Sequence, residues 1–105
     1  MKLNKSNIKG DISFDGAQIG GNVDFESAKI SGSVSFYGAN IKGDLWFDEA
    51  SILKYSWFEK SEIGGETSFN NVYVGRSISF QYSQMNENLS FHDSKINGNV
   101  WFDRA

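Results

Sequence analysis

The sequence predicts an all-β solenoid, in which short strands stack in parallel from one coil to the next. Three observations predict it: one apolar pattern recurs every eleven residues, its apolar positions lie two residues apart, and proline is absent. Proline commonly fixes ordinary turns, whereas a repeating ladder of strands needs its backbone N–H groups. The length of 105 residues fits a single domain, 1–105.

The repeat is clearest at phenylalanine, because all nine Phe residues fall at intervals of eleven. An aliphatic residue lies six positions before each Phe, a second apolar residue usually lies two before it, and a small residue usually lies three after it. No insertion interrupts the series, which indicates nine consecutive units. The phenylalanines are Phe14, Phe25, Phe36, Phe47, Phe58, Phe69, Phe80, Phe91 and Phe102.

The repeating unit reads I-x-G-x-V-x-F-x-x-A-x, and its apolar positions form two pairs, V-x-F and A-x-I. A spacing of two is typical of a strand with one side buried. The many Gly, Ser and Asn residues disfavour a helix. Because turn-forming residues separate the pairs, the strands must be very short, and a fixed period of short strands indicates a solenoid.

Particular segments of the repeat resemble a known family. Ala39-Asn40-Ile41-Lys42-Gly43 matches the A-(D/N)-L-x-x motif of pentapeptide-repeat proteins, and each V-x-F-x-x segment fits the same pattern. The resemblance covers the whole chain, with a unit of two pentapeptides plus one extra residue. It implies a right-handed, four-sided parallel β-helix of about five coils, in which each coil consists of two of the eleven-residue units.

The two-unit coil leads to two geometric expectations. Phe25 should stack on Phe47, and Phe36 on Phe58, whereas a coil of one unit would place Phe36 on Phe47. One pair of corners must also accommodate the extra residue, and we expect the glycine before it to adopt positive φ. These glycines are Gly10, Gly21, Gly32, Gly43, Gly65 and Gly98.

The fifth to eighth units follow the pattern less strictly than the first four. Lys54, Arg76 and Glu87 replace the glycine, Ser56 and Thr67 replace the valine, and Ser61, Ser83 and Ser94 replace the alanine. One interpretation is neutral drift, since a serine in the alanine position can hydrogen-bond a turn backbone. The other is that this half of the chain was modified to present a surface.

Composition excludes several classes of function. The net charge of −3 argues against direct nucleic acid binding, and no apolar run suggests a signal peptide or a membrane contact. Without cysteine, nothing requires an oxidising compartment, and we expect a cytoplasmic protein. His92, the single histidine, is expected on the surface. We therefore predict no catalytic residues, no metal site, no cofactor and no enzymatic activity.

Two groups of residues are candidates for a protein-binding surface. The three Trp and four Tyr residues all take outward positions, and Tyr55 and Trp57 lie two apart on one strand. Acidic residues of alternate units fall on one side of the solenoid, where the segments contain no Lys or Arg. We expect reversal of Asp44, Asp48 and Glu66 to Lys to leave thermal stability nearly unchanged. The candidate surface comprises Asp24, Glu26, Asp44, Trp46, Asp48, Glu49, Tyr55, Trp57 and Glu66.

These features predict a non-catalytic structural or protein-interaction module with an unknown protein partner. An alternative follows from the family resemblance, in which an acidic rod mimics DNA and binds a type II topoisomerase such as DNA gyrase. An ice-binding solenoid would need a regular threonine array, and Thr67 is the only threonine. Because Phe102 lies in the last unit, we also expect homo-oligomers formed by end-to-end stacking, or a continuation of the chain.

Overall fold

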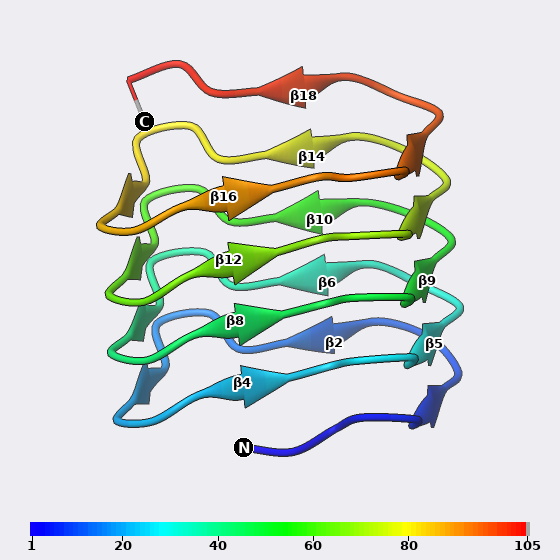
Figure 1. Cartoon of the computed structure of the whole chain (residues 1–105), viewed down its shortest axis with the longest axis horizontal. Helices are drawn as coiled ribbons and strands as arrows, with labels where there is room; N and C mark the ends of the chain where they lie inside the picture. Colours follow the sequence, from blue (N-terminus) through cyan, green and yellow to red (C-terminus); the bar gives the residue numbers. More distant parts are fainter. Residues whose placement is uncertain (105) are drawn as a thin grey trace.

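The computed structural model describes residues 1–104, which form eighteen β-strands of two residues each and no helix. None of these residues therefore belongs to a helix long and apolar enough to cross a membrane. The strands make four parallel sheets, one on each side of the molecule (Figure 1). Two sheets have five strands, namely β1 (Asn7–Ile8), β5 (Lys29–Ile30), β9 (Ser51–Ile52), β13 (Tyr73–Val74) and β17 (Lys95–Ile96), and β2 (Ile12–Ser13), β6 (Val34–Ser35), β10 (Ser56–Trp57), β14 (Ile78–Ser79) and β18 (Val100–Trp101). Two have four strands, namely β3 (Gln18–Ile19), β7 (Asn40–Ile41), β11 (Glu62–Ile63) and β15 (Gln84–Met85), and β4 (Val23–Asp24), β8 (Leu45–Trp46), β12 (Thr67–Ser68) and β16 (Leu89–Ser90).

The pairing confirms a coil of two units. Each strand from β1 to β14 pairs in parallel with the strand two units further along the chain, as Ile30 does with Ile52, and consecutive strands belong to consecutive sides (Figure 1). The chain winds as a right-handed, four-sided parallel β-helix of about four turns, slightly fewer than the five expected. Its Cα extents of 27 × 26 × 23 Å make it nearly as wide as it is tall.

Two ladders of phenylalanine fill the interior. Phe25 stacks on Phe47 with ring centroids 4.7 Å apart, and Phe36 stacks on Phe58 at 5.3 Å, as predicted for the larger coil. Phenylalanines eleven residues apart meet edge to face instead, as Phe36 does with Phe47 at 6.5 Å. Each coil therefore holds one Phe from each ladder. Burial of such side chains stabilises the fold by about 1.5–3 kcal/mol each.

The corner after each phenylalanine is a tight turn. At seven of the phenylalanines the backbone N–H three residues later donates to the Phe carbonyl, as Ala50 does to Phe47 at 2.9 Å. At Phe69 the N–H of Val72 donates instead to Oγ of Ser94, at 3.4 Å. The residue two after the Phe adopts positive φ, which the third residue of a type II turn requires. Glycine occupies this position only at Gly16 and Gly38. The others are Ser27, Glu49, Lys60, Asn71, Tyr82, Asp93 and Arg104, with φ between 55° and 62°.

The expectation of positive φ at the other corner was wrong for most of its glycines. Only Gly10 has positive φ, at 115°; Gly21, Gly32, Gly43, Gly65 and Gly98 do not. In the stacked coils glycine is needed for close approach instead. A Cβ at Gly43 would lie 2.8 Å from the carbonyl of Gly21 and 2.2 Å from Oδ1 of Asn22 in the preceding coil.

The looser units keep the same backbone, and the hydrogen bond expected of serine in the alanine position is present. The hydroxyls of Ser61 and Ser83 donate to the carbonyls of Phe58 and Phe80, at 2.6 and 2.5 Å. Serine and threonine in the valine position differ, because Ser56 and Thr67 are buried and their hydroxyls have no hydrogen-bond partner among residues 1–104. Ala105, the alanine position of the ninth unit, lies outside the described residues.

Candidate functional site

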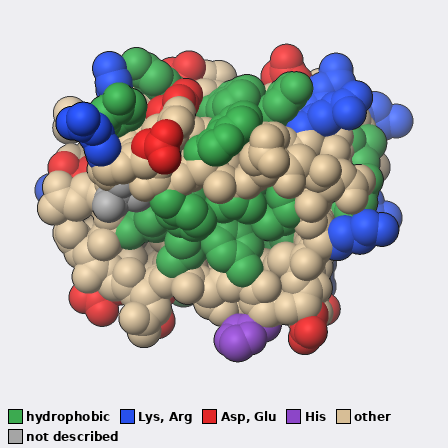
Figure 2. Space-filling view, turned by 90° about the horizontal axis from the view of Figure 1, so that it is seen from above, with side chains coloured by type: hydrophobic (Ala, Val, Ile, Leu, Met, Phe, Trp, Pro, Cys, Tyr) green, Lys and Arg blue, Asp and Glu red, His purple; other side chains and the backbone are tan. Residues whose placement is uncertain are grey.

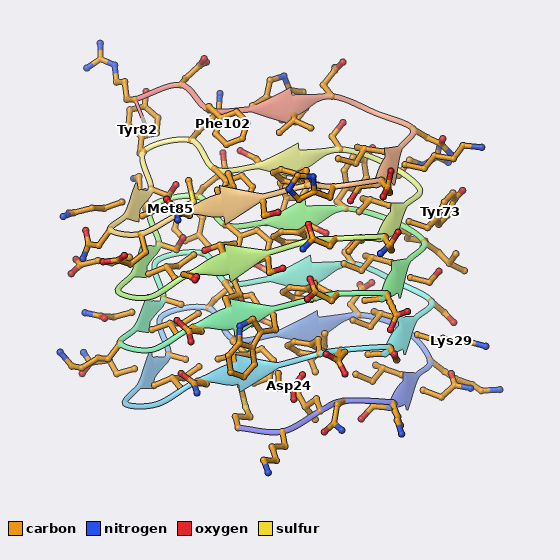
Figure 3. All side chains as sticks on the ribbon, viewed as in Figure 1. Asp24, Lys29, Tyr73, Tyr82, Met85 and Phe102 are labelled. Carbon is orange, nitrogen blue, oxygen red and sulfur yellow. The ribbon has the colours of Figure 1, made fainter. Side chains whose placement is uncertain are left out.

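The predicted acidic side of the molecule corresponds to one sheet. Strands β4, β8, β12 and β16 form the side that faces the viewer in Figure 1, and Figure 3 labels Asp24 on its first strand. The segments that cross this side, residues 22–27, 44–49, 66–71 and 88–93, contain no Lys or Arg. We call this side the acidic face, and its carboxylates are Asp24, Glu26, Asp44, Asp48, Glu49, Glu66 and Asp93.

Two of these carboxylates also hold neighbouring coils together. Oδ1 of Asp44 accepts a hydrogen bond from the backbone N–H of Glu66 at 2.7 Å. Oδ1 of Asp48 accepts from the backbone N–H of Asn70 at 3.0 Å and from the hydroxyl of Ser68. Hydrogen bonds to charged groups contribute about 1.5–3 kcal/mol each. The expectation that replacing Asp44 and Asp48 by Lys leaves stability unchanged is therefore revised, whereas Glu66 is exposed and its carboxylate makes no such bond in the described chain.

The extra residue of each unit explains part of this arrangement. Its side-chain oxygen accepts the backbone N–H one coil further on, as Asp11 does from Ser33 at 2.8 Å and Asn22 from Asp44 at 2.8 Å. Sequence reasoning treated this residue as an insertion to be accommodated and missed its role. The residue types at this position could have revealed the role. The position holds Asp, Asn or Ser, whose side-chain oxygens accept hydrogen bonds, in every unit except those of Tyr55 and Glu66.

The nine residues of the candidate surface do not lie together. Tyr55 precedes Ser56 of β10, and Trp57 ends that strand, so both lie on the sheet β2-β6-β10-β14-β18, which is on the side of the solenoid opposite the acidic face (Figure 1). Their rings stack with centroids 4.8 Å apart and planes 13° apart. Trp46 belongs to the acidic face, where it pairs in register with Asp24 and Ser68. The predicted set is therefore two separate surfaces, and we call the side with Tyr55 and Trp57 the aromatic face.

The remaining chemistry is sparse in the part of the chain that the structure describes. His92 is exposed on the acidic face, and its backbone N–H donates to Oδ1 of Asn70 at 2.9 Å. Residues 1–104 contain no group of three His, Cys, Asp or Glu side chains placed to hold a metal ion. Two of the surface hollows lie on the other two sides: one of about 330 Å³, lined by Asn7, Lys29, Ile30, Ser31, Ser51 and Leu53, and one of about 260 Å³, lined by Gln18, Ile19, Gly20, Asn40 and Lys42.

Comparison with known proteins agrees with this geometry. The family model for pentapeptide repeats (9 copies) matches residues 3–51 and 25–72, which together span about two thirds of the chain. A search of curated proteins and a search of solved structures each returned no match. The matched region includes the first six phenylalanines, and the last coils continue the same register beyond it. The chain belongs to the pentapeptide-repeat family.

Proposed function

We propose that this protein is a non-catalytic interaction module whose acidic face binds a basic protein partner. The observation that carries the proposal is the segregation of charge: seven carboxylates share one side, and its described segments contain no Lys or Arg. Figure 2, which looks down on the last coil, has Asp and Glu but no Lys or Arg along its lower edge, which is the acidic face. Such a surface steers an oppositely charged partner toward it.

The rigidity of the face supports binding rather than catalysis. Hydrogen bonds fix the carboxylates of Asp44 and Asp48 to the next coil, so their charges keep a constant spacing without an ordering cost on binding. Catalytic sites commonly enclose a substrate in a pocket with converging polar groups, whereas phenylalanine fills the interior of these coils.

The test uses carboxylates that do not stabilise the fold. Glu26 and Glu66 are exposed members of the acidic face, and Glu59 and Glu62 lie on other sides. The double variants Glu26→Lys/Glu66→Lys and Glu59→Lys/Glu62→Lys change the net charge equally. We expect the first to weaken binding of a fluorescent Lys-rich peptide at least tenfold, measured by anisotropy at low salt. Equal weakening by both would show that only the overall charge matters and would overturn the proposal.

A second candidate function rests on the same face, since an acidic rod can imitate the phosphates of DNA. If the protein binds DNA gyrase in this way, it should inhibit supercoiling at micromolar concentration, and Glu26→Lys/Glu66→Lys should relieve the inhibition. No inhibition by the unmodified protein would remove this candidate and leave the interaction module.

End-to-end association stays a prediction. The last described coil exposes apolar side chains in the middle of its upper surface (Figure 2), and Phe102 there is 42% exposed. We expect this surface to contact the end of a second copy. Sedimentation of the unmodified protein beside Phe102→Ser tests this, and equal association of the two proteins at high concentration contradicts it.

A further inference from the structure

The aromatic face has two unlike halves. In one coil a row of large side chains leads from the corner onto this face: Leu53 and Lys54 follow strand β9 at the corner, and Tyr55 and Trp57 lie on the face itself. Leu53 is 50% exposed and Tyr55 is 37% exposed. In the preceding coil the same positions are all small, with Ser31, Gly32, Ser33 and Ser35. We call the first row (53–57) the ridge and the second (31–35) the shelf.

The coils on either side of the ridge and the shelf differ in how far their surface is covered. Below the shelf, the first coil carries Gly10 and Ser13, but Lys9 and Asp11 occupy the other two positions, so the row of small residues is one coil high. Above the ridge, Ser79 lies in register between Trp57 and Trp101 and is fully buried, which is consistent with cover by the flanking indoles. Ser35, whose other neighbour is Ser13, stays half-exposed. The ridge therefore stands beside an open step on one side only.

We propose that the aromatic face binds a second copy of this chain, with the ridge of each copy lying on the shelf of the other. A two-fold axis along the strand direction, between the coils of residues 31–38 and 53–60, brings identical surfaces together, as symmetric dimers require. Rotation about this axis leaves each residue at the same place along the strand direction and reverses the order in which the coils stack. It places Tyr55 against Ser33 and Trp57 against Ser35 of the second copy, with Lys54 beside Gly32 at the corner of the face.

The charges of the aromatic face fit a second copy, unlike those of the acidic face. Its acidic groups are Asp11, Asp15, Glu59 and Asp103, and Lys54, Lys60, Arg76 and Arg104 lie on it or at its corners. The same rotation sets Arg76 opposite Gly10 of the second copy, between Asp11 on this face and Lys9, which follows strand β1 on the adjacent side. Figure 2 shows hydrophobic and acidic side chains along the upper edge of the view, which is this face, with Lys and Arg at both of its corners. Two acidic faces would instead repel each other.

The size of the face is sufficient for a specific dimer. With Cα extents of 27 and 26 Å across it, the face offers about 700 Å² per copy, close to the ~800 Å² of a standard interface. Both acidic faces point away from this contact, so the dimer carries two outward surfaces for basic partners and gains avidity for a partner with two sites.

The test measures association over a range of protein concentration by sedimentation velocity, on variants for which the chain itself supplies the replacement. Tyr55→Ser/Trp57→Ser converts the ridge to the serines found one coil below and one coil above. It should shift the dimer dissociation constant upward at least tenfold. Ser35→Trp fills the shelf with a residue that Trp46, Trp57 and Trp101 show to be tolerated at this position. It should disrupt the dimer equally, although it adds apolar surface.

Two control variants distinguish this contact from non-specific association through exposed aromatic side chains and from end-to-end stacking. Trp46→Ser removes an indole from the equivalent position of the acidic face, and Phe102→Ser alters the last coil. Neither should change the dissociation constant of the ridge-to-shelf dimer, although Phe102→Ser should remove end-to-end association. Stronger association of Ser35→Trp, or a loss of dimer in Trp46→Ser or Phe102→Ser comparable to that of the ridge variant, would overturn the proposal. A strict monomer at several hundred micromolar would overturn it as well. Circular dichroism verifies that each variant keeps the fold.

Discussion

The turn after each phenylalanine predicts an unusual stabilising substitution, Glu49→Gly. Glu49 is exposed and has a φ of 62°, a region that costs an L-residue roughly 1–2 kcal/mol. Glycine removes this strain but adds freedom to the unfolded chain, which offsets about 0.4–1 kcal/mol. The net gain should be about 0.5–1 kcal/mol, which raises the melting temperature by about 2–8 °C in a domain of this size. Thermal unfolding followed by circular dichroism measures it.

The matched control is Glu62→Gly, which removes the same side chain and the same charge. Glu62 is also exposed, but it lies in strand β11 and is not among the residues with positive φ. Glycine there should destabilise the fold by about 0.5–1 kcal/mol. Opposite signs for the two variants support the argument from backbone strain. A lower melting temperature for Glu49→Gly would refute it, and would mean that the turn tolerates any residue without strain.

Three further substitutions test the interior and the corners, each by urea denaturation. Phe47→Ala should cost about 3–5 kcal/mol, because it interrupts a stacked ladder in mid-molecule; a cost below about 1 kcal/mol would contradict the packing. Ser56→Val should raise the free energy of unfolding by about 1–3 kcal/mol, because it removes a buried hydroxyl that has no hydrogen-bond partner among the described residues. A decrease of the same size would indicate that the hydroxyl does form a hydrogen bond. Gly65→Ala should cost at least about 1–3 kcal/mol, because its Cβ would lie 2.7 Å from a carbonyl of the preceding coil, whereas a neutral result would show that the corner relaxes.

The fold was largely predictable because its determinants repeat in the sequence. The spacing of the phenylalanines and the alternation within each unit predicted the strands, and the resemblance to a family supplied the two-unit coil. The role of the corner glycines was mispredicted, because a close approach such as that of Gly43 to Gly21 arises only between stacked coils. The positive φ at Lys60 or Tyr82 had no signal in residue type, since both residues normally avoid that region.

The candidate surface was predictable in composition but not in arrangement. In a coil of two units, alternate units lie on the same side of the molecule. This rule predicted which acidic residues share a side, and the acidic face agrees with it. Tyr55 and Trp57 were grouped with it although their unit faces the opposite side. The structural roles of Asp44 and Asp48 depend on backbone groups one full coil away, and no local pattern reveals such a partner.

The two-unit coil has a consequence for how such a chain can change by duplication. Adding two units lengthens the molecule by one coil and leaves every side chain on its own side. Adding one unit keeps the phenylalanine ladders filled, yet it carries each later residue across the molecule, so that Glu66 would join the aromatic side. The gain or loss of a single unit therefore leaves the packing of the interior almost unchanged but alters which residues share each outer side. New surfaces can arise in this architecture with little loss of folding stability.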